Sequence, residues 1–407
     1  MKCRHCGADM TLPLIDLGSA PPSNAYLTPE KLHSPELWFP LRVLVCQKCW
    51  LVQTEDFTQA DELFNAEYAY FSSTSKSWLA HAAQYSQAII KDLGLNSDSF
   101  VIEIASNDGY LLKNFVKKEI PCLGIEPTAS TAAVAEKLGI PVLREFFGEP
   151  LGQRLADQGQ QANLIVGNNV YAHVPDINDF TRGLKAALKP GGTITLEFPH
   201  VMKLIQQVQF DTIYHEHFSY LSLYTVNKIF NDAGLKIWDT EELSTHGGSL
   251  RVYGCHKDDR RSITGRVQSI LDQEATASLQ NPIPYQTFQE RANTVKNHLI
   301  SFLVEQKRKG KQVAAYGAAA KGNTLLNYAG IKPDLLPYIC DASPAKQGKF
   351  MPGSRIPVVN ESQIKSTKPS YVVILPWNLK KEIMLQLEYI RDWGGKLVLA
   401  IPQMEVI

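Results

Sequence analysis

The chain of 407 residues lacks a charge excess of either sign, because Lys plus Arg and Asp plus Glu both number 41. It therefore has no global basic field of the kind that attracts nucleic acid or an anionic membrane surface. No apolar run reaches the length of a membrane span, and the N-terminal stretch MKCRHCGADM has cysteines where a signal peptide needs its apolar segment. We expect a cytoplasmic protein with no nucleic-acid and no membrane partner, which leaves a small charged metabolite open.

Two familiar motifs are also missing. The stretch YHEHFSY at 214–220 does not match the HExxH zinc motif, because its histidines are two residues apart and would diverge on a helix. The loop EIASNDG at 103–109 lacks GxGxxG, so the pyrophosphate cradle of a dinucleotide site is not evident. These absences argue against a metal site in the first stretch and against NAD in the second.

Cysteine, in contrast, is present in an informative pattern. Cys3 and Cys6 form one CxxC pair, and Cys46 and Cys49 form another. Each pair can present two thiolates from a tight turn, and two such turns complete the tetrahedron of a closed structural zinc site. The alternative is a set of redox or buried cysteines, but a thioredoxin-type CxxC should follow a strand of a βαβ unit, which neither pair does. We predict one structural zinc ion.

The middle of the chain alternates apolar runs with amphipathic segments, from FVIEIASNDG to GGTITLEFP. This alternation predicts a parallel sheet with helices on both faces and ligands at the carboxyl ends of its strands. Glu126 ends the second strand in GIEP, where a carboxylate can bind the ribose hydroxyls of NAD or S-adenosylmethionine. Because the first loop has no pyrophosphate motif, it favours S-adenosylmethionine.

A second α/β pattern follows a charged helical stretch at about 258–308. In KQVAAYGAAAKGNTLLNYAG an apolar strand turns at Tyr316 and Gly317, and Lys321 opens a helix, so backbone N–H groups and a lysine converge where a diphosphate could bind. Close packing explains the small residues equally well. Asp341 closes a later strand of the same pattern.

Six segments in order resemble the sugar C-methyltransferases that act on nucleotide-linked deoxyhexoses: CxxC…CxxC, EIASNDGYLL, NNVYAHVPD, YHEHFSYLS, GGSLRVYG and YGAAAKGNTLLNY. The resemblance implies an α/β protein in three parts. These are a small zinc-binding N-terminal module (1–65), a central Rossmann-type class I methyltransferase domain that binds S-adenosylmethionine (66–256), and a helical linker with a Rossmann-like C-terminal α/β domain that helps to hold the sugar nucleotide (257–407). The general pattern ExGxGxG is only partly met, since Ala105 and Asn107 stand at two glycine positions and Gly109 is retained.

The resemblance also assigns candidate site residues. Those for the cofactor are Glu103, Ala105, Asn107, Asp108, Gly109, Glu126, Phe146, Phe147, Asn168 and Asn169. Those for the substrate are His215, Tyr316, Gly317, Lys321 and Asn323, and the catalytic candidates are His217, Tyr214, Glu216, His173, Tyr68 and Tyr70. The alternatives are core packing for the two phenylalanines, a capping or core role for His173, a solvated carboxylate for Glu126, and a polar surface patch for the histidine stretch.

The predicted function follows from the chemistry of carbon methylation. A sulfonium methylates carbon only when a carbanion equivalent is available, and a ketone next to the target carbon supplies one as an enolate once a base removes the α-proton. His217 is the predicted base, with Tyr214 and Glu216 as helpers and Tyr68 or Tyr70 as further groups that polarise the ketone. Strand alternation would place Tyr214 and His217 on opposite faces, so we expect the motif to bend.

We therefore predict an S-adenosylmethionine-dependent C-methyltransferase of deoxysugar biosynthesis that acts on a nucleotide-linked 4-keto-6-deoxyhexose. A zinc-module nucleic-acid methyltransferase is an alternative that the neutral charge balance disfavours. A non-catalytic nucleotide-sugar-binding protein is another, but it would leave the histidines idle. The sequence leaves open whether methylation falls at C-3 or C-5, whether dTDP, GDP or CDP carries the sugar, whether the sugar has an amino group, and the oligomeric state, a monomer included.

Overall fold

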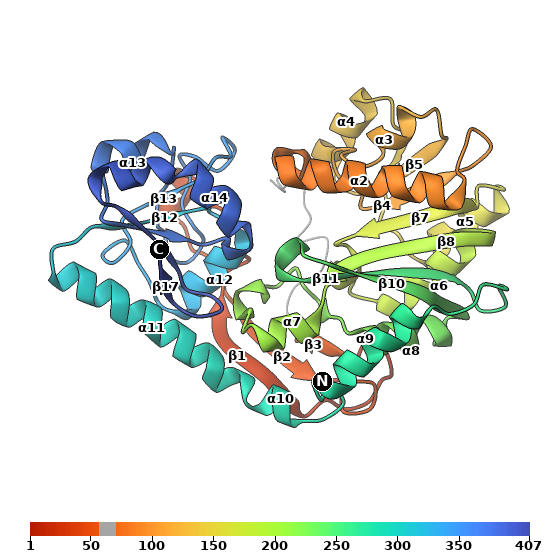
Figure 1. Ribbon diagram of the computed structural model, residues 1–407, viewed down its shortest axis with the longest axis horizontal. Helices are drawn as coiled ribbons and strands as arrows, with labels where there is room; N and C mark the ends of the chain where they lie inside the picture. Colours follow the sequence, from red (N-terminus) through yellow and green to blue (C-terminus); the bar gives the residue numbers. More distant parts are fainter. Residues whose placement is uncertain (57–70) are drawn as a thin grey trace.

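A computed structural model describes residues 1–56 and 71–407, which form three sheets with helices packed around them (Figure 1). The predicted α/β class, with an N-terminal cysteine module followed by two larger α/β parts, is confirmed. Tyr68, Tyr70 and the expected boundary at residue 65 lie outside the described residues. Among the residues described, no helix is long and apolar enough to cross a membrane.

The N-terminal sheet is antiparallel and includes a strand from much later in the chain. Its order is β1-β2-β3-β9, with bounds β1 (Leu12–Ala20), β2 (Phe39–Val45), β3 (Val52–Thr54) and β9 (Ser219–Tyr220). A short 3₁₀ helix, η1 (Glu30–His33), lies in the β1–β2 connection. Because β9 is formed by the last two residues of the stretch YHEHFSY, this sheet fixes the carboxyl end of that stretch.

The central sheet has seven strands in the order β10-β11-β8-β7-β4-β5-β6. Their bounds are β4 (Val101–Ile104), β5 (Cys122–Ile125), β6 (Val142–Leu143), β7 (Ala162–Asn168), β8 (Leu188–Pro199), β10 (Leu235–Leu243) and β11 (Ser249–His256), and β11 runs antiparallel to both of its neighbours. The strand order reverses between β4 and β7, and open α/β sheets bind ligands in the crevice at such a switch point. The candidate site should therefore lie beyond Ile104 and Asn168.

Helices cover both faces of this sheet (Figure 1). The helices of this part are α2 (Lys76–Leu93), α3 (Lys113–Val116), α4 (Ala129–Lys137), α5 (Glu149–Asp157), α6 (Ile177–Ala187) and α8 (Leu223–Asp232), with the short turns η2 (Ser72–Thr74), η3 (Tyr171–His173) and η5 (Thr245–Gly247). Two further elements, α7 (Val201–Gln206) and η4 (Phe210–Thr212), pack in the core shared with the N-terminal sheet. Side-chain caps set the starts of α2 and α6: the Ser75 hydroxyl accepts from the Trp78 N–H, and the Asp176 carboxylate accepts from two N–H groups of α6.

The C-terminal sheet has the order β14-β13-β12-β15-β16-β17 and is parallel except for its last strand. Its strands are β12 (Val313–Tyr316), β13 (Ile339–Cys340), β14 (Val358–Val359), β15 (Tyr371–Ile374), β16 (Lys396–Leu399) and β17 (Glu405–Val406). The helices of this part are α10 (Ile283–Gln286), α11 (Phe288–Arg308), α12 (Ala320–Tyr328), α13 (Ser362–Thr367), α14 (Lys380–Gln386), η6 (Trp377–Leu379) and η7 (Glu388–Trp393). The preceding helix α9 (Gly265–Thr276) packs instead on β10 and α8 of the central part.

The N-terminal sheet connects the two larger parts (Figure 1). One apolar core joins Leu14 and Val43 of this sheet to Leu299 of α11 and Val313 of β12. A second core joins the cysteine turns to the strands and helices of the central part. The N-terminal module is therefore packed against both larger parts.

Candidate active site and metal centre

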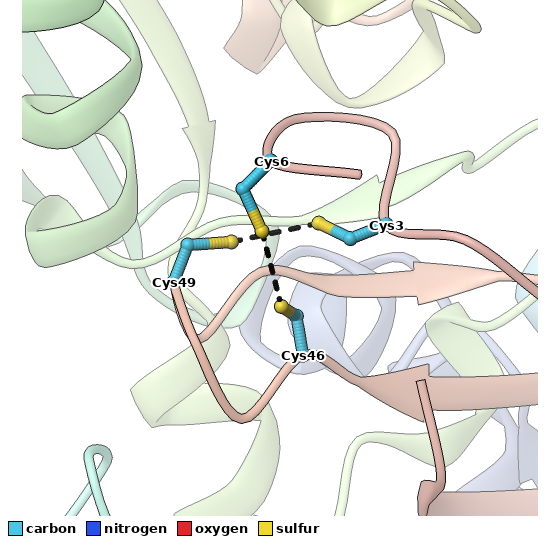
Figure 2. A group of neighbouring side chains, drawn as sticks. All are labelled: Cys3, Cys6, Cys46 and Cys49. Carbon is cyan, nitrogen blue, oxygen red and sulfur yellow. Dashed lines mark hydrogen bonds between the residues drawn. The ribbon is translucent and has the colours of Figure 1, made fainter. Parts of the chain in front are cut away.

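The four N-terminal cysteines form a single cluster (Figure 2). The sulfurs of Cys3 and Cys49 are 3.5 Å apart, as are those of Cys6 and Cys46, and all four lie within 4.8 Å of one another. A tetrahedral zinc ion with bonds of about 2.3 Å needs sulfurs about 3.8 Å apart, so the residues fit zinc with all four positions filled by the protein. Within the described part of the chain no other such group of ligands occurs, and the histidine stretch forms none.

The cysteine turns contact the central part directly. The Arg4 guanidinium donates to the Pro175 carbonyl at 2.9 Å, and His5 Nδ1 lies 2.8 Å from the Asn178 side-chain oxygen at the start of α6. Cys3, Cys46 and Cys49 are all buried. The metal centre therefore fixes the junction of two parts of the molecule and leaves no open position for chemistry.

The loop after β4 adopts a glycine-type backbone with only one glycine. Ala105, Asn107 and Gly109 have φ of 56°, 49° and 76°, all in the left-handed region. Ala105 and Asn107, which stand where the general pattern has glycine, therefore keep the glycine-type loop conformation at a cost in backbone strain. Gly109 itself is required, because a Cβ there would lie 2.5 Å from the Ile140 side chain.

Carboxylates and amides cluster at the ends of β4, β5 and β7. Glu126 accepts the Asn107 N–H at 3.0 Å and the Thr128 N–H at 2.9 Å, which holds the loop against the strand end. The buried Glu103 carboxylate has Tyr110 and the Leu112 backbone as its polar neighbours, and both amide atoms of the buried Asn168 are without a hydrogen-bond partner among the described residues. Burial raises the pKa of Glu103 well above its ordinary value.

Buried polar groups without partners are costly in a protein that has nothing to bind to them. Their concentration at the switch point fits a ligand that carries an amino group and hydroxyls, as the methionine end and the ribose of S-adenosylmethionine do. Asp108 contributes another such oxygen, while its second oxygen accepts the Ser73 N–H at 3.0 Å and Asn107 accepts the Ser72 N–H at 2.9 Å. The loop is thus braced from the η2 side.

The two phenylalanines after β6 have different surroundings. The Phe147 ring lies 5.2 Å from the Phe180 ring and packs on the central core. Phe146 is 52 % exposed, so its ring is the more accessible of the two, while Phe147 is only partly buried.

The histidine stretch bends as expected. The His217 N–H donates to the Tyr214 carbonyl at 2.9 Å, which closes a turn and brings the two rings to a centroid distance of 4.0 Å. The His173 ring lies 4.6 Å from the His217 ring on another side. The structure therefore brings together His217, Tyr214 and His173, three of the predicted catalytic residues.

The protonation of His217 follows from its partner. Its Nδ1 lies 2.7 Å from the Thr212 carbonyl oxygen, which can only accept, so Nδ1 carries the proton and Nε2 keeps its lone pair. Burial, together with the neighbouring His173, holds the pKa of His217 well below its usual 6.5. A neutral imidazole with a free Nε2 is the form that a general base requires.

Two members of the stretch face the N-terminal module. His215 Nε2 lies 3.2 Å from the Pro40 carbonyl oxygen, and its ring meets the edge of the Phe39 ring. The Glu216 carboxylate accepts a hydrogen bond of 2.7 Å from the Asn24 amide. Asn24 was missed by sequence reasoning, because it lies in an irregular proline-rich segment with no signal of chemistry.

The C-terminal part approaches the same region through the first turn of α12. Lys321 Nζ lies 3.2 Å from the Asn378 side-chain oxygen and 4.9 Å from the centre of the Trp377 ring. Asn323 is fully buried, and in the described part of the chain neither of its side-chain amide atoms has a hydrogen-bond partner. Trp377 in turn donates to Asp211 of η4 at 2.7 Å, so the central and C-terminal parts meet here.

The Tyr316 side chain makes its contacts within the C-terminal part, and its assignment to substrate binding stays a prediction. This side chain belongs to the C-terminal core, and its hydroxyl donates to Glu361 at 3.2 Å. The adjacent Gly317 has φ of 90° and lies so close to Pro376 that a Cβ would be 2.4 Å away. Close packing accounts for this turn.

Three sequence families match the chain: a zinc binding domain at residues 3–64, a methyltransferase domain at residues 78–240 and a C-methyltransferase C-terminal domain at residues 244–402. A curated relative, C-methyltransferase NovU of Streptomyces niveus, is 32% identical over 406 residues, which cover 100% of this chain and 96% of the relative.

The similar solved structures have lower sequence identity to this chain and match a smaller part of it. Magnesium protoporphyrin IX methyltransferase of Synechocystis PCC 6803 is 13% identical over 43% of this chain and 81% of that chain, with a TM-score of 0.34. An S-adenosylmethionine-dependent methyltransferase of Clostridium acetobutylicum is 11% identical over 42% of this chain and 89% of that chain, also with a TM-score of 0.34.

Proposed function

Because the chain belongs to the S-adenosylmethionine-dependent C-methyltransferases, we propose that it methylates the carbon next to the ketone of a nucleotide-linked 4-keto-6-deoxyhexose. The observation that carries this proposal is the state of His217, a buried neutral imidazole whose Nδ1 proton is held by a carbonyl at 2.7 Å. An imidazole that is neutral at pH 7 can accept a proton through Nε2, and removal of a carbon-bound proton is the step that carbon methylation of a ketone requires.

In the proposed reaction His217 Nε2 takes the proton from the carbon next to the ketone. The electron pair of the broken C–H bond forms a carbon–carbon double bond in the sugar, and negative charge develops on the ketone oxygen. Tyr214 packs on His217 and holds its ring in place. His173 remains neutral, because burial lowers its pKa to about 4, so it adds no fixed positive charge beside the base at neutral pH.

S-adenosylmethionine, when bound, supplies the methyl group as an electrophile. The residues that would hold it are those at the ends of β4, β5 and β7, with Glu126 at the ribose and Glu103, Asp108 and Asn168 toward the methionine end. Phe146 is the candidate for the adenine. These residues approach from the central sheet, whereas the base belongs to the turn that precedes β9.

The sugar nucleotide would lie between the central part and α12. Lys321 supplies positive charge for a diphosphate, and Asn323 supplies buried amide groups that have no partner among the described residues. Glu216, held by Asn24, remains a candidate helper, and His215 and Gly317 remain candidates for substrate contact. The name of the S. niveus relative agrees with methyl transfer to carbon.

The experiment has two parts. Incubation with S-adenosylmethionine and a panel of 4-keto-6-deoxy sugar nucleotides should give a C-methylated product whose methylated carbon NMR assigns. Separately, with S-adenosylhomocysteine in D₂O, the wild type should exchange the proton next to the ketone without methyl transfer. His217→Asn should lose both activities by about 10²- to 10⁴-fold, the usual contribution of a general base.

His256→Asn is the matched control. His256 lies at the end of β11 near the amino end of β8, where its Nε2 contacts the Leu188 carbonyl at 3.0 Å. This substitution should leave exchange and methylation at wild-type rates. Wild-type exchange by His217→Asn would remove His217 as the base, and absence of product with every 4-keto sugar would overturn the substrate class.

A further inference from the structure

We propose that His246 is a further catalytic residue, which donates its Nδ1–H to the ketone oxygen of the substrate as that oxygen gains negative charge. This inference rests on the proposed function and adds the group that receives the charge. His246 belongs to η5 in the segment THGGSL, which lies between β10 and β11.

Two strained residues meet at this point. His246 has φ of 53°, and Asn169, directly after β7, also has φ of 53°. A non-glycine residue in the left-handed region costs free energy, and such strain persists only where the surrounding structure enforces it, most often at functional sites. Here the two strained residues are joined by their side chains, since Asn169 Nδ2 lies 3.0 Å from His246 Nε2.

This contact fixes the tautomer of His246. An amide nitrogen can only donate, so His246 Nε2 accepts and the ring proton lies on Nδ1. No described residue forms a hydrogen bond to Nδ1, and the residue as a whole is intermediate in burial. His246 therefore presents a fixed N–H donor that the residues described in the structure leave unused.

The turn that carries His246 is held on several sides. The Thr245 hydroxyl donates to Glu197 at 2.9 Å, and Glu197 is fully buried against Arg251 at 2.7 Å. On the other side Gly247 lies against Trp377, where a Cβ would come within 2.3 Å of the ring. A donor held in this way needs little reorganisation when charge develops, which is the property of an oxyanion hole.

The surroundings keep His246 neutral. Burial, with Lys321 as the next cause, lowers the pKa of His246 to about 4. Lys321 Nζ lies 3.5 Å from the His246 carbonyl oxygen, so the turn also adjoins the lysine expected at the diphosphate. The donor at neutral pH is thus an imidazole that stabilises an enolate oxygen without carrying a full charge of its own.

The step balances with the groups already named. The C–H bond next to the ketone breaks, its proton goes to His217 Nε2, and its electron pair forms the carbon–carbon double bond. The π electrons of the ketone move onto its oxygen, where the His246 Nδ1–H hydrogen bond strengthens. When the electrons of the carbon–carbon double bond form the new bond to the methyl carbon, the electron pair of the breaking sulfur–methyl bond stays on the sulfur of the donor. The ketone reforms, and His217 retains the proton until product leaves.

Two substitutions separate a donor role from a purely structural one. In His246→Asn the side-chain amide can place an N–H near the former Nδ1, and asparagine tolerates the left-handed backbone. In His246→Gln the amide reaches the former Nε2 and keeps the contact with Asn169, but the Nδ1 donor is lost. We expect His246→Gln to lower the exchange rate in D₂O with S-adenosylhomocysteine by about 10²- to 10³-fold, the usual effect of removing one oxyanion donor.

His246→Asn should retain exchange within about tenfold of the wild type if the donor is what matters. The reverse order, with His246→Gln the more active variant, or equal activity of both variants and the wild type, would overturn the proposal. The thermal midpoint and calorimetric binding of S-adenosylhomocysteine should be the same for both variants, and a loss of either in His246→Gln would assign the residue a structural role. Absence of exchange in the wild type would instead contradict the proposed function itself.

Discussion

Removal of the zinc ion should unfold more than the N-terminal module. Three of its four ligands, Cys3, Cys46 and Cys49, are at most 3 % exposed. They lie in the same apolar core as Leu51 of the module and Ile165 of β7. Loss of the metal would therefore leave uncompensated thiols inside the core of the central part, and the effect should spread beyond the cysteine turns.

The magnitude can be compared with the stability of a typical domain. A structural zinc site contributes about 10–16 kcal/mol of apparent binding free energy at neutral pH, and a natural domain is stable by only about 5–15 kcal/mol. Removing two of the four zinc ligands should thus cost a large part of the free energy of unfolding. We expect Cys46→Ser/Cys49→Ser to abolish zinc binding and to remove the cooperative thermal transition of the central part.

The assay combines metal analysis with thermal unfolding followed by circular dichroism. Cys255→Ser is the matched control, because Cys255 is fully buried in β11 and lies outside the cluster. This substitution should lower the free energy of unfolding by about 1–3 kcal/mol, because it buries a hydroxyl without a partner, and it should leave one zinc ion per chain. A zinc-free double variant that unfolds cooperatively at the wild-type temperature would refute the reasoning.

The remaining predictions concern the site. Glu126→Gln should weaken S-adenosylmethionine binding by about 1.5–3 kcal/mol, and unchanged calorimetric affinity would argue against a ribose contact. Asn24→Asp would replace the donor to Glu216 with a second carboxylate at about the same 2.7 Å distance, so kcat should fall, whereas a wild-type kcat would leave Asn24 without a positioning role. Because the pKa of His217 is held below 6.5 and its neutral form is the active one, kcat/KM should stay at its plateau at about pH 6, and an acid limb centred near 6.5 would contradict this. Ala105→Gly should stabilise the fold by about 1 kcal/mol through relief of its positive φ, as measured by denaturant unfolding, and a loss of stability would show that the loop is not strained.

Local patterns in the sequence predicted the features that depend on local spacing. The two CxxC pairs gave the metal cluster, and the alternation of strands and helices gave the central sheet with Glu126 at a strand end. The bend at Tyr214 was expected because strand alternation would have separated it from His217. In each case the residues that act together lie within one element or repeat one short pattern.

Contacts between distant segments were not predictable in this way. Asn24 and Glu216 are separated by 192 positions, and no periodicity links them. Ala105 and Asn107 looked like departures from a glycine pattern, because sequence does not reveal that the loop imposes a left-handed backbone on non-glycine residues. The packing of Tyr316 in the C-terminal core was likewise not indicated by the turn that follows it, because the alternation along β12 sets the direction of its side chain.

The shared N-terminal sheet also affects the synthesis of the chain. A ribosome delivers β3 about 170 residues before β9, which at usual elongation rates is roughly ten to thirty seconds. During this time the edge of β3 has no partner, and the face of β1 still lacks α11, which is translated later. The first segment to leave the ribosome is therefore among the last to finish folding. A chimaera that exchanges only this segment between relatives would have to form its sheet with a foreign β9 and a foreign α11.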